Sequence, residues 1–479
     1  MVQPQKNLFY KFLLLSILIT TFRIFFLYIN KLELSPDEAQ YYSWSLIPAF
    51  GYYSKPPMIA YVISISTKLF GNSEWAIRAC APILYGMSGV LVYLITEILS
   101  DKKSNIPFTA GVVFLTLPPV SLASAIISTD SCLILFWLSA VFFFLQAIRE
   151  QKFYQYLLCG ISAGLGMLSK YNMGMFLISA CLYLIINRPY LKKSYVFIAV
   201  TVAFLIYLPN IYWNASHGFV TFSHTHEISG YGNKFAFKID KFLQFILAQL
   251  MIVGPIVSFY FIRNLNKNPN QHLLPFIAPF FIVIASLSLV SKALANWASP
   301  IYPLIIISAA IFLKPKFIKY TLIFNLIVSG VFYAYPLITD KYHLNLNAKS
   351  GTYLKRDPFK NMRGHALLAT EIEKLANDNQ AYTILTDERK LTAELLYYTH
   401  NLKFRKYNHH IHDHYDLTIG LGTKDAGENF LYVTKLENSN HLNGLFKSNQ
   451  YIGTISIMLY KDYTLKYYVF YLQGYKINA

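Results

Sequence analysis

The sequence predicts a polytopic α-helical membrane protein that ends in a small α/β domain. Of its 479 residues, 55% are hydrophobic and only 14% are charged, whereas a soluble domain typically has about 25% charged residues. Long apolar runs recur through residues 1–337, and several are as long as the ~20 residues that an α-helix needs to cross a bilayer. Residues 338–479 are polar instead, with short alternating runs. We therefore expect a membrane domain over 1–337 and a second domain over 338–479.

Eleven apolar runs predict about eleven spans. They lie at residues 8–29, 77–98, 107–126, 130–148, 156–169, 172–187, 195–212, 241–262, 272–290, 298–313 and 317–336. If the N-terminus is cytoplasmic, the basic loops DKKSN, REQK, NRPYLKK, RNLNKN and KPKFIK all fall on the cytoplasmic side, as the positive-inside rule requires. An odd number of spans then places residues 338–479 on the outer side.

The C-terminal segment has the pattern of a mixed α/β domain. The run NMRGHALLATEIEKLAND has the apolar spacing of a helix, and QAYTILTD directly after it alternates as a strand does. A second alternating run, FLYVTKL, follows later in the chain. The sequence therefore predicts a small α/β domain on the outer side.

The net charge of +18 does not indicate nucleic-acid binding. Most of the excess lies in short loops between spans, where basic residues set topology and can hold anionic lipid headgroups. The four cysteines lie in or beside apolar segments, so the polar domain has no disulfide framework.

Residues 30–76, the first outer loop, begin with a segment typical of a juxtamembrane helix. The sequence SPDE has a serine and a proline that favour a helix start, followed by Asp37 and Glu38 in the first turn. With helical spacing, Asp37, Tyr41 and Trp44 share a face. Acids at a helix N-terminus also favour the helix dipole without any other role. A structural and a functional role both stay open for this pair.

Asp130 is a second acid at a notable position. It stands in IISTDSCLILFW, at the outer start of the fourth predicted span and just ahead of an unbroken apolar run. Helix capping by Thr129 and Asp130 is one interpretation. An ionisable group at membrane depth is otherwise a candidate for function.

Among the lysines on the predicted outer side, three are candidates for function, and two of them, Lys170 and Lys292, run against the positive-inside bias. Lys55 stands in YYSKPP, where the prolines keep the backbone extended and fix the direction of the ammonium group. It can snorkel to the lipid interface, or it can bind a lipid phosphate as a compact positive donor. Lys170, in LSKYNMG, and Lys292, in SKALANWASPIYP, are the other two.

Histidines cluster in NASHGFVTFSHTHE, at His217, His224 and His226, beside Glu227. Their side chains could bind a divalent metal. The spacing does not match a specific zinc motif, so an interfacial loop is the favoured interpretation, and no other cofactor is expected.

Several of these motifs, in this order, resemble bacterial glycosyltransferases of the GT-C class. They are the acidic pair after the first span, YYSKPP, STDSCLILF, GLGMLSKYNMG and NWASPIYP, with RDPFKNMRG and LTDERKLTAELLYY in the tail. The branch that they resemble contains protein O-mannosyltransferases and the aminoarabinose transferase of lipid A. The resemblance covers about residues 8–313. It implies a polyprenyl-phosphate sugar donor, used on the periplasmic face of the bacterial inner membrane.

The resemblance also implies roles for individual residues. Asp37 matches the catalytic aspartate, Asp130 a second functional acid, Lys55 the lysine on the donor phosphate, and Lys292 lies where basic residues contact that phosphate. Aminoarabinose transferases tend to have an acid just before the lysine of YYSKPP, where Ser54 stands here. This difference puts in doubt any metal site that would use that acid.

These observations predict transfer of a sugar from polyprenyl (undecaprenyl) phosphate to lipid A, lipopolysaccharide, another envelope glycan or a protein. Cations would stabilise the leaving phosphate, and Asp37 would take the proton of an acceptor hydroxyl, with inversion at the sugar carbon. The predicted catalytic residues are Asp37, Glu38 and Asp130, the phosphate-binding residues are Lys55, Lys170 and Lys292, and the sugar or acceptor site contains Tyr41, Trp44, Tyr52, Tyr53, His217 and Tyr302.

Two other classes of function are alternatives to the sugar transferase. A transporter or lipid flippase fits the many spans, but transporters commonly show repeated halves, and no repeat is visible here. An adhesin or sensor would need far fewer spans as an anchor.

Overall fold

The computed structural model describes residues 3–100, 104–229, 237–267, 270–291, 293–342, 357–408, 410–460 and 463–477. The chain divides into two compact units. The first, the membrane unit, contains residues 1–29 and 49–333, and the second, the outer unit, contains residues 30–48 and 334–479. This division into compact units does not test the predicted domain limits 1–337 and 338–479, which stay a prediction.

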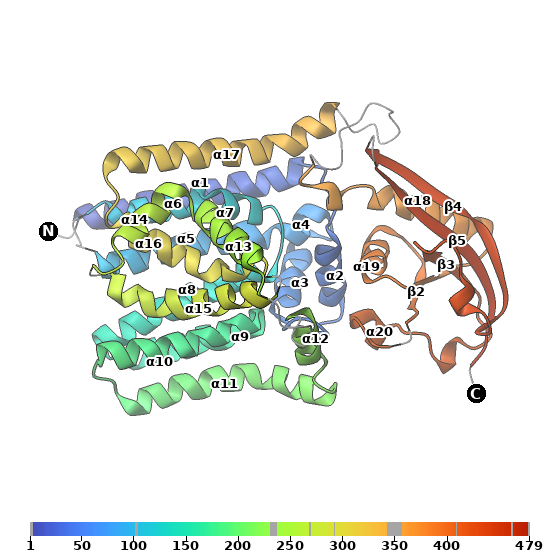
Figure 1. The fold of residues 1–479 in the computed structure, drawn as a ribbon, viewed down its shortest axis with the longest axis horizontal. Helices are drawn as coiled ribbons and strands as arrows, with labels where there is room; N and C mark the ends of the chain where they lie inside the picture. The colour runs from blue at the N-terminus through green and yellow to red at the C-terminus, as the bar shows by residue number, and fades with distance from the viewer. Residues whose placement is uncertain are drawn as a thin grey trace. The chain divides into compact units, whose positions relative to one another are not determined.

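The membrane unit is helical throughout its described residues (Figure 1). Its elements are α1 (Gln3–Ile29), α3 (Met58–Phe70), α4 (Glu74–Arg78), α5 (Cys80–Leu99), α6 (Ile106–Thr116), α7 (Pro118–Ala123), α8 (Thr129–Glu150), α9 (Phe153–Ser169), the 3-10 helix η1 (Tyr171–Gly174), α10 (Met175–Asn187), α11 (Lys193–Ser216), α12 (Val220–Ser229), α13 (Ile239–Val253), α14 (Pro255–Arg263), α15 (Asn270–Val290), the 3-10 helix η2 (Ala295–Ile301), α16 (Tyr302–Ala310) and α17 (Pro315–Tyr342). The last residues of α17 belong to the outer unit.

The helices confirm a multi-pass membrane fold, but they do not confirm a count of eleven spans. By length and composition, six helices in the described part of the chain can cross a membrane, or seven if a bent pair counts as one span. Shorter apolar helices lie at Met58–Phe70, Ile106–Thr116 and Tyr171–Asn187. Several predicted spans are therefore shorter or broken helices.

Proline and glycine break these predicted spans. The run 107–126 divides at Leu117, because two prolines follow it and start a new helix, α7. The run 241–262 bends by 101° between α13 and α14. The bend lies at Gly254, whose φ of 92° is in the left-handed region that glycine adopts without strain.

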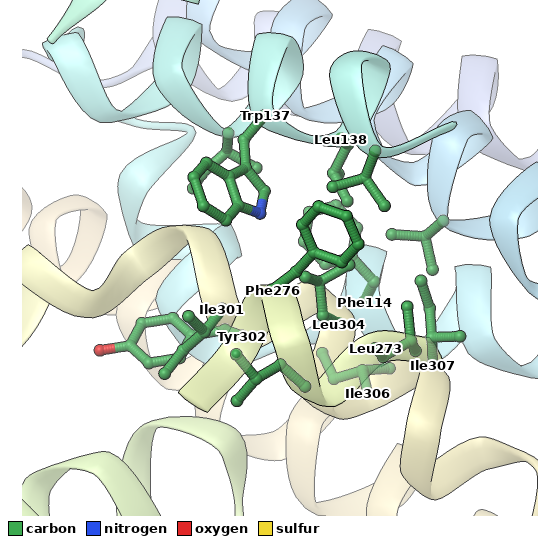
Figure 2. Packing of buried hydrophobic residues seen from close by; sticks show 14 of the residues in the cluster. Phe114, Trp137, Leu138, Leu273, Phe276, Ile301, Tyr302, Leu304, Ile306 and Ile307 are labelled. Carbon is green, nitrogen blue, oxygen red and sulfur yellow. The ribbon is translucent and has the colours of Figure 1, made fainter. Parts of the chain in front are cut away.

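Part of the core of the membrane unit lies between α6, α8, α15 and α16 (Figure 2). Trp137 from α8 lies near Phe276 from α15, with Leu304 from α16 beside them. The Trp137 ring meets the ring of Phe280 edge-on, with centroids 5.3 Å apart, an arrangement that aromatic pairs favour. This packing fixes the start of α8, where Asp130 lies.

Small residues bring α9 and α11 close together. Gly160 and Gly164 are one helical turn apart on α9. A Cβ at Gly160 would overlap the backbone of Ala199 in α11, and a Cβ at Gly164 would lie 2.8 Å from Cβ of Ile206. Glycine pairs of this spacing are typical of closely packed helices in membranes.

The outer unit combines helices with one sheet. Its elements are α2 (Pro36–Leu46), the 3-10 helix η4 (Lys360–Met362), α18 (His365–Asp378), β1 (Thr383–Thr386), α19 (Arg389–Tyr398), β2 (Lys403–Lys406), α20 (His414–Thr418), the 3-10 helix η5 (Thr423–Asp425), β3 (Phe430–Thr434), the 3-10 helix η6 (Asn440–Leu442), β4 (Phe446–Tyr460) and β5 (Tyr463–Tyr475). Helix α18 followed by β1 confirms the predicted helix and strand.

The five strands form one mixed sheet in the order β2-β1-β3-β5-β4. Strand β1 is parallel to β2 and β3, with Ile384 opposite Phe404 on one side and Leu431 on the other. Strands β4 and β5 form a long antiparallel hairpin (Figure 1). Buried side chains of α18 and α19 pack on one face of the sheet, and a second apolar cluster lies against the other face.

Residues 30–48 are part of the outer unit because polar groups hold them there. Glu33 accepts hydrogen bonds from the backbone N–H groups of His365, at 2.6 Å, and Ala366, at 3.3 Å. These groups open α18, which has no side-chain cap of its own. A carboxylate at this end also complements the helix dipole. The Leu34 N–H donates to the Tyr398 hydroxyl of α19 at 2.7 Å.

We expect Gly160→Ala to force α9 and α11 apart, because its added Cβ would overlap the Ala199 backbone. Overpacking of this kind typically costs about 1–3 kcal/mol. The measurement is the thermal unfolding of purified protein in detergent. Gly330→Ala is the matched control, since nothing lies within 4 Å of its added Cβ. Equal melting temperatures for the two variants would contradict the close packing.

Candidate functional site

A buried ion pair lies at the start of α8. Asp130 accepts hydrogen bonds from the Lys170 ammonium at 2.8 Å and the Ser299 hydroxyl at 3.0 Å, both on Oδ1. Its Oδ2 accepts from the Asn296 amide at 3.0 Å. The side chains of Asp130 and Lys170 are only 11% and 12% exposed. The carboxylate therefore joins α8 to the end of α9 and to η2.

Both oxygens of Asp130 are thus occupied by protein donors. A buried carboxylate loses its hydration, and it is tolerated when a counter-charge and hydrogen bonds replace the water. Asp130 has both. Its carboxylate therefore holds the Lys170 ammonium in place. The capping interpretation is incomplete, since the bonds go to residues distant in sequence and the N-cap Ser128 makes no side-chain capping bond.

Lys55 and Lys170 line the same hollow, which has a volume of about 190 Å³. The other residues that line it are Ser54, Pro56, Tyr171, Asn172, His224, Thr225, Ile284, Leu287 and Trp297. The hollow combines two cations with aromatic and apolar walls. Such a site fits an anion attached to an apolar chain.

The loop that carries Lys55 is held by backbone and side-chain contacts. Tyr52 and Lys55 exchange backbone hydrogen bonds of 3.1 and 3.4 Å, which closes a tight turn. The Asn210 amide donates to the Phe50 carbonyl at 2.7 Å, and the Thr221 hydroxyl donates to the Tyr52 carbonyl at 3.1 Å. Segments from α11 and α12 therefore fix the position of Lys55.

Two predicted sugar-site tyrosines, Tyr52 and Tyr53, are buried in this loop. The Tyr53 ring lies next to His224, with centroids 5.0 Å apart. The Tyr52 hydroxyl accepts a hydrogen bond from the Ala49 N–H at 3.1 Å. Burial raises the pKa of Tyr52 to about 12, so its hydroxyl stays protonated at neutral pH. Neither tyrosine lines the hollow itself, so both pack within the loop that carries Lys55, and their sugar-site role stays a prediction.

His217 and Tyr302 lie in different surroundings from the hollow. His217 ends α11 and is exposed, with its ring stacked on Trp213 at a centroid distance of 4.1 Å. The buried Tyr302 hydroxyl lies 2.7 Å from the Gln249 side-chain oxygen and 2.6 Å from the Ala295 carbonyl. Neither residue lines the hollow with Lys55, and their predicted roles stay predictions.

In the outer unit, α2 begins with a complete capping box. The Ser35 side chain accepts from the Glu38 N–H, and Glu38 Oε2 accepts from the Ser35 N–H at 3.0 Å. Glu38 is buried. Its carboxylate therefore accepts a backbone N–H at the start of the helix, as in a capping box. This contact supports a structural role for Glu38.

Asp37 occupies a different position on the same helix. Its side chain is 63% exposed, and Oδ1 accepts a hydrogen bond from Nη1 of Arg389 at 3.0 Å. The same Nη1 donates to the side-chain oxygen of Gln40. Arg389 is the first residue of α19, which packs against α2 within the outer unit (Figure 1). The guanidinium group thus orients an otherwise accessible carboxylate.

The aromatic residues of α2 anchor that helix. Tyr41 and Trp44 are buried, with ring centroids 5.3 Å apart, and the Trp44 ring also meets the ring of His414. The Ser43 hydroxyl lies 2.9 Å from the Tyr415 hydroxyl of α20. These contacts hold the face of α2 that was predicted to line a sugar site.

Some predicted residues lie beyond what the structure describes. Lys292 is outside the described residues, and so are the side chains of His226 and Glu227. Among the described residues, no group of three histidine, cysteine or acidic side chains could hold a metal ion. The metal interpretation stays a prediction.

Sequence reasoning missed the partners of both acids. Asn296 and Ser299 bind Asp130, and both lie in the motif NWASPIYP, whose local pattern predicts no contact with an acid. Arg389 donates hydrogen bonds to Asp37 and Gln40, and it lies about 350 positions from Asp37 in the chain. The motif LTDERKLTAELLYY contained this arginine, but its local pattern indicates only a helix.

Comparison with known proteins identifies relatives of this chain. The family model described as dolichyl-phosphate-mannose-protein mannosyltransferase matches residues 54–213. The lipid A galacturonosyltransferase RgtD of Rhizobium johnstonii is 32% identical over 408 residues, which cover 82% of this chain and 84% of that protein. The undecaprenyl phosphate-alpha-4-amino-4-deoxy-L-arabinose arabinosyl transferase of Yersinia enterocolitica is 27% identical over 187 residues, or 37% of this chain and 33% of that protein.

The fold is also found in solved structures. The apo crystal structure of ArnT from Cupriavidus metallidurans matches with a TM-score of 0.65 at 12% identity, over 96% of this chain and 97% of that chain. The structure of the same protein bound to undecaprenyl phosphate matches with a TM-score of 0.63 at 13% identity, over the same shares of both chains. Together with the long match to the galacturonosyltransferase, this places the chain in the family of ArnT-like GT-C glycosyltransferases.

Proposed function

We propose that this glycosyltransferase moves a sugar from a polyprenyl phosphate to lipid A or another part of lipopolysaccharide. The observation that carries the proposal is the hollow in which Lys55 and the Asp130-bound Lys170 meet. The names of its relatives support the acceptor and the donor: one acts on lipid A and another uses an undecaprenyl phosphate sugar. Family membership favours this activity over the transporter and the adhesin.

The two lysines would bind the donor phosphate. Negative charge on that phosphate grows as the bond to the sugar breaks, and fixed cations in a site with apolar walls stabilise it. Asp130 would act indirectly, because it holds the Lys170 ammonium in place through the 2.8 Å ion pair. We therefore assign Asp130 a positioning role in place of direct proton transfer.

Asp37 would act on the acceptor. Its exposed carboxylate can take the proton of an attacking hydroxyl as a general base, with inversion at the sugar carbon. If the acceptor is a phosphate of lipid A, no proton has to be removed, and Asp37 would then orient the acceptor or stabilise positive charge at the sugar carbon.

Which sugar this chain transfers is a separate question, because the sugars that the relatives' names give differ in charge. RgtD is named for galacturonic acid, which carries a carboxylate, and the Yersinia enzyme for an aminoarabinose, which carries an amine. Transfer to a protein hydroxyl is a second candidate, favoured by the description of the family model that matches residues 54–213.

We further propose that the chain lies in the bacterial inner membrane with the outer unit in the periplasm. Five basic loops with the same predicted orientation support this topology. A polyprenyl phosphate sugar needs no nucleotide, and that suits a compartment without nucleotide sugars.

Asp37→Asn should abolish the modification of lipid A while the protein still folds and inserts. Loss of a general base typically lowers the rate by about 100- to 10,000-fold. The measurement is mass spectrometry of lipid A, other envelope glycans and envelope proteins from cells that carry each variant. Glu371→Gln, an exposed acid of the same unit, is the control. Wild-type levels of modification in Asp37→Asn cells would remove Asp37 from the mechanism.

Lys55→Gln should raise KM for the lipid donor, because Lys55 binds the donor phosphate, and should also lower kcat, because the negative charge on that phosphate grows as the bond to the sugar breaks. A hydrogen bond to a charged group contributes about 1.5–3 kcal/mol, which corresponds to a rise of about 10- to 100-fold. Steady-state kinetics with purified donor and acceptor tests this. Lys68→Gln, an exposed lysine at the end of α3, is the control. An unchanged KM for the donor would refute the phosphate role of Lys55.

A cysteine introduced at the exposed Lys424 of η5 should react with a membrane-impermeant maleimide once the outer membrane is opened. The wild-type chain, with its four native cysteines, gives the background. Labelling that requires disruption of the inner membrane would overturn the proposed orientation.

A further inference from the structure

A second hollow with two cations lies in the membrane unit, where the start of α13 meets the end of α15. Its volume is about 550 Å³, against about 190 Å³ for the hollow that contains Lys55. Three polar side chains at the start of α13 line it, those of Lys238, Lys241 and Gln244. The other lining residues are small or apolar: Phe245, Ala248, Ser291, Ala293 and Ala295. This basic hollow is separate from the groups assigned to the donor phosphate.

Contacts between α13, α15 and η2 fix the walls of this hollow. The Lys238 N–H donates to the Leu289 carbonyl of α15 at 2.7 Å. The Gln249 amide of α13 donates to the Ala295 carbonyl of η2 at 3.3 Å, and the Tyr302 hydroxyl lies 2.7 Å from the Gln249 side-chain oxygen. Gln249 and Tyr302 are buried. The segments that line the hollow are therefore joined to one another by hydrogen bonds.

The two ammonium groups are available to an anion. The Lys241 side chain is 50% exposed, and it pairs with the exposed Asp240 only at 3.7 Å, whereas a close charge-assisted hydrogen bond is about 2.7–2.9 Å long. Lys238 is exposed as well, and no acid in the described part of the chain pairs with its ammonium. One acid beside two cations leaves a net positive charge at the hollow.

The opposite face of α13 is apolar and exposed. Its residues recur every four positions, at Ile239, Leu243, Leu247 and Met251. With about 3.6 residues per turn, this stripe lies away from Lys241 and the other residues that line the hollow. In a membrane-spanning unit an exposed apolar stripe faces lipid chains. The hollow is therefore one helix away from the surrounding lipid, which suits a ligand that arrives from the membrane.

The 3-10 helix η2 lies between the two hollows of the membrane unit. Ala295 lines the larger one, and Trp297 lines the one that contains Lys55. Asn296, between them in the chain, donates to Asp130 at 3.0 Å. Two cationic hollows on either side of one short segment fit two anionic ligands held close together. Because the smaller hollow is assigned to the donor phosphate, the larger one is left for the second substrate.

We propose that Lys238 and Lys241 bind a phosphate on the glycolipid head group of the acceptor. A lysine ammonium is a compact charge that suits phosphate, whereas a planar guanidinium group matches a carboxylate better, and the described lining contains two lysines and no arginine. The larger volume leaves room for a sugar beside the phosphate. This inference rests on the proposed function, since the hollow serves the acceptor only if the neighbouring hollow holds the donor.

Direct binding of two probe lipids tests the proposal without a donor. The probes are lipid A and the same lipid A with its phosphates removed enzymatically, each added to the purified full chain in detergent. We expect the wild type to bind the phosphorylated form about 10- to 100-fold more tightly, as hydrogen bonds to a charged group predict. The double variant Lys238→Gln, Lys241→Gln should bring the ratio of the two Kd values close to one, and each single variant should give an intermediate ratio.

Two controls separate binding from folding and from general charge. Lys68→Gln removes one exposed lysine from the same unit and should keep the wild-type ratio. The melting temperature of the double variant should not fall, because lysines at the N-terminal end of α13 oppose the helix dipole. A wild-type ratio of Kd values in the double variant would overturn the proposal.

Two further lipids identify a wrong ligand. If the double variant bound phosphatidylglycerol as much more weakly as it bound lipid A, the hollow would hold any anionic lipid, and the proposal would be wrong. If it bound the polyprenyl phosphate donor equally more weakly, the lysines would belong to the donor site, and the proposal would again be wrong. Unchanged binding of both lipids, with the phosphate-dependent loss for lipid A, would support it.

Transfer of the sugar to the two forms of lipid A separates this inference from the proposed function. Equal transfer to both forms, by the wild type and the double variant alike, would support the function and overturn the role of the hollow. Phosphate-dependent binding at the two lysines without transfer to either form would overturn the proposed acceptor and support the hollow as a site for a phosphorylated glycolipid.

Discussion

The buried carboxylate of Asp130 is the charged group on which the proposed donor phosphate site of the membrane unit depends. An ionised side chain without water needs a counter-charge and a full set of hydrogen bonds. Lys170, Asn296 and Ser299 provide them, and they come from the end of α9 and from η2. Since Lys170 cannot move away from Asp130 without leaving a buried charge unpaired, the ion pair fixes the lysine that lines the hollow.

The outer unit follows the same physical rule with a different acid. Glu33 satisfies the free N–H groups that open α18, and so it holds residues 30–48 in that unit. Helix α2 is then oriented by its capping box, by buried aromatic rings and by Arg389. Asp37 differs from Glu33 and Glu38 because most of its side chain stays exposed. An accessible, oriented carboxylate is available for chemistry, whereas a capping carboxylate is not.

This distribution explains how four acids of similar sequence environment take different roles. Glu33 and Glu38 satisfy helix ends, Asp130 fixes a cation, and Asp37 stays largely exposed beside Arg389. A glycosyltransferase that uses a lipid phosphate needs both kinds of group, because a fixed cation must meet the leaving phosphate and an accessible carboxylate must meet the acceptor.

The sequence by itself determined the membrane class, the family, and the helix and strand at the start of the C-terminal segment. All of these follow from composition, from local periodicity or from short motifs. The count of eleven spans was not confirmed, because Pro118 and Gly254 break apolar runs that composition treats as continuous. The roles of Glu38 and Asp130 were left open, since a capping acid and a catalytic acid look alike in one dimension.

Only the tertiary structure decided which group meets each acid. Lys170 reaches Asp130 across 40 positions of sequence, and Arg389 reaches Asp37 across about 350. Pairs of this kind leave no periodic signal, because their spacing depends on how whole helices pack. The sequence therefore indicated which residues are chemically capable, and the packing determined which of them are neutralised, which are held in position, and which stay accessible to a substrate.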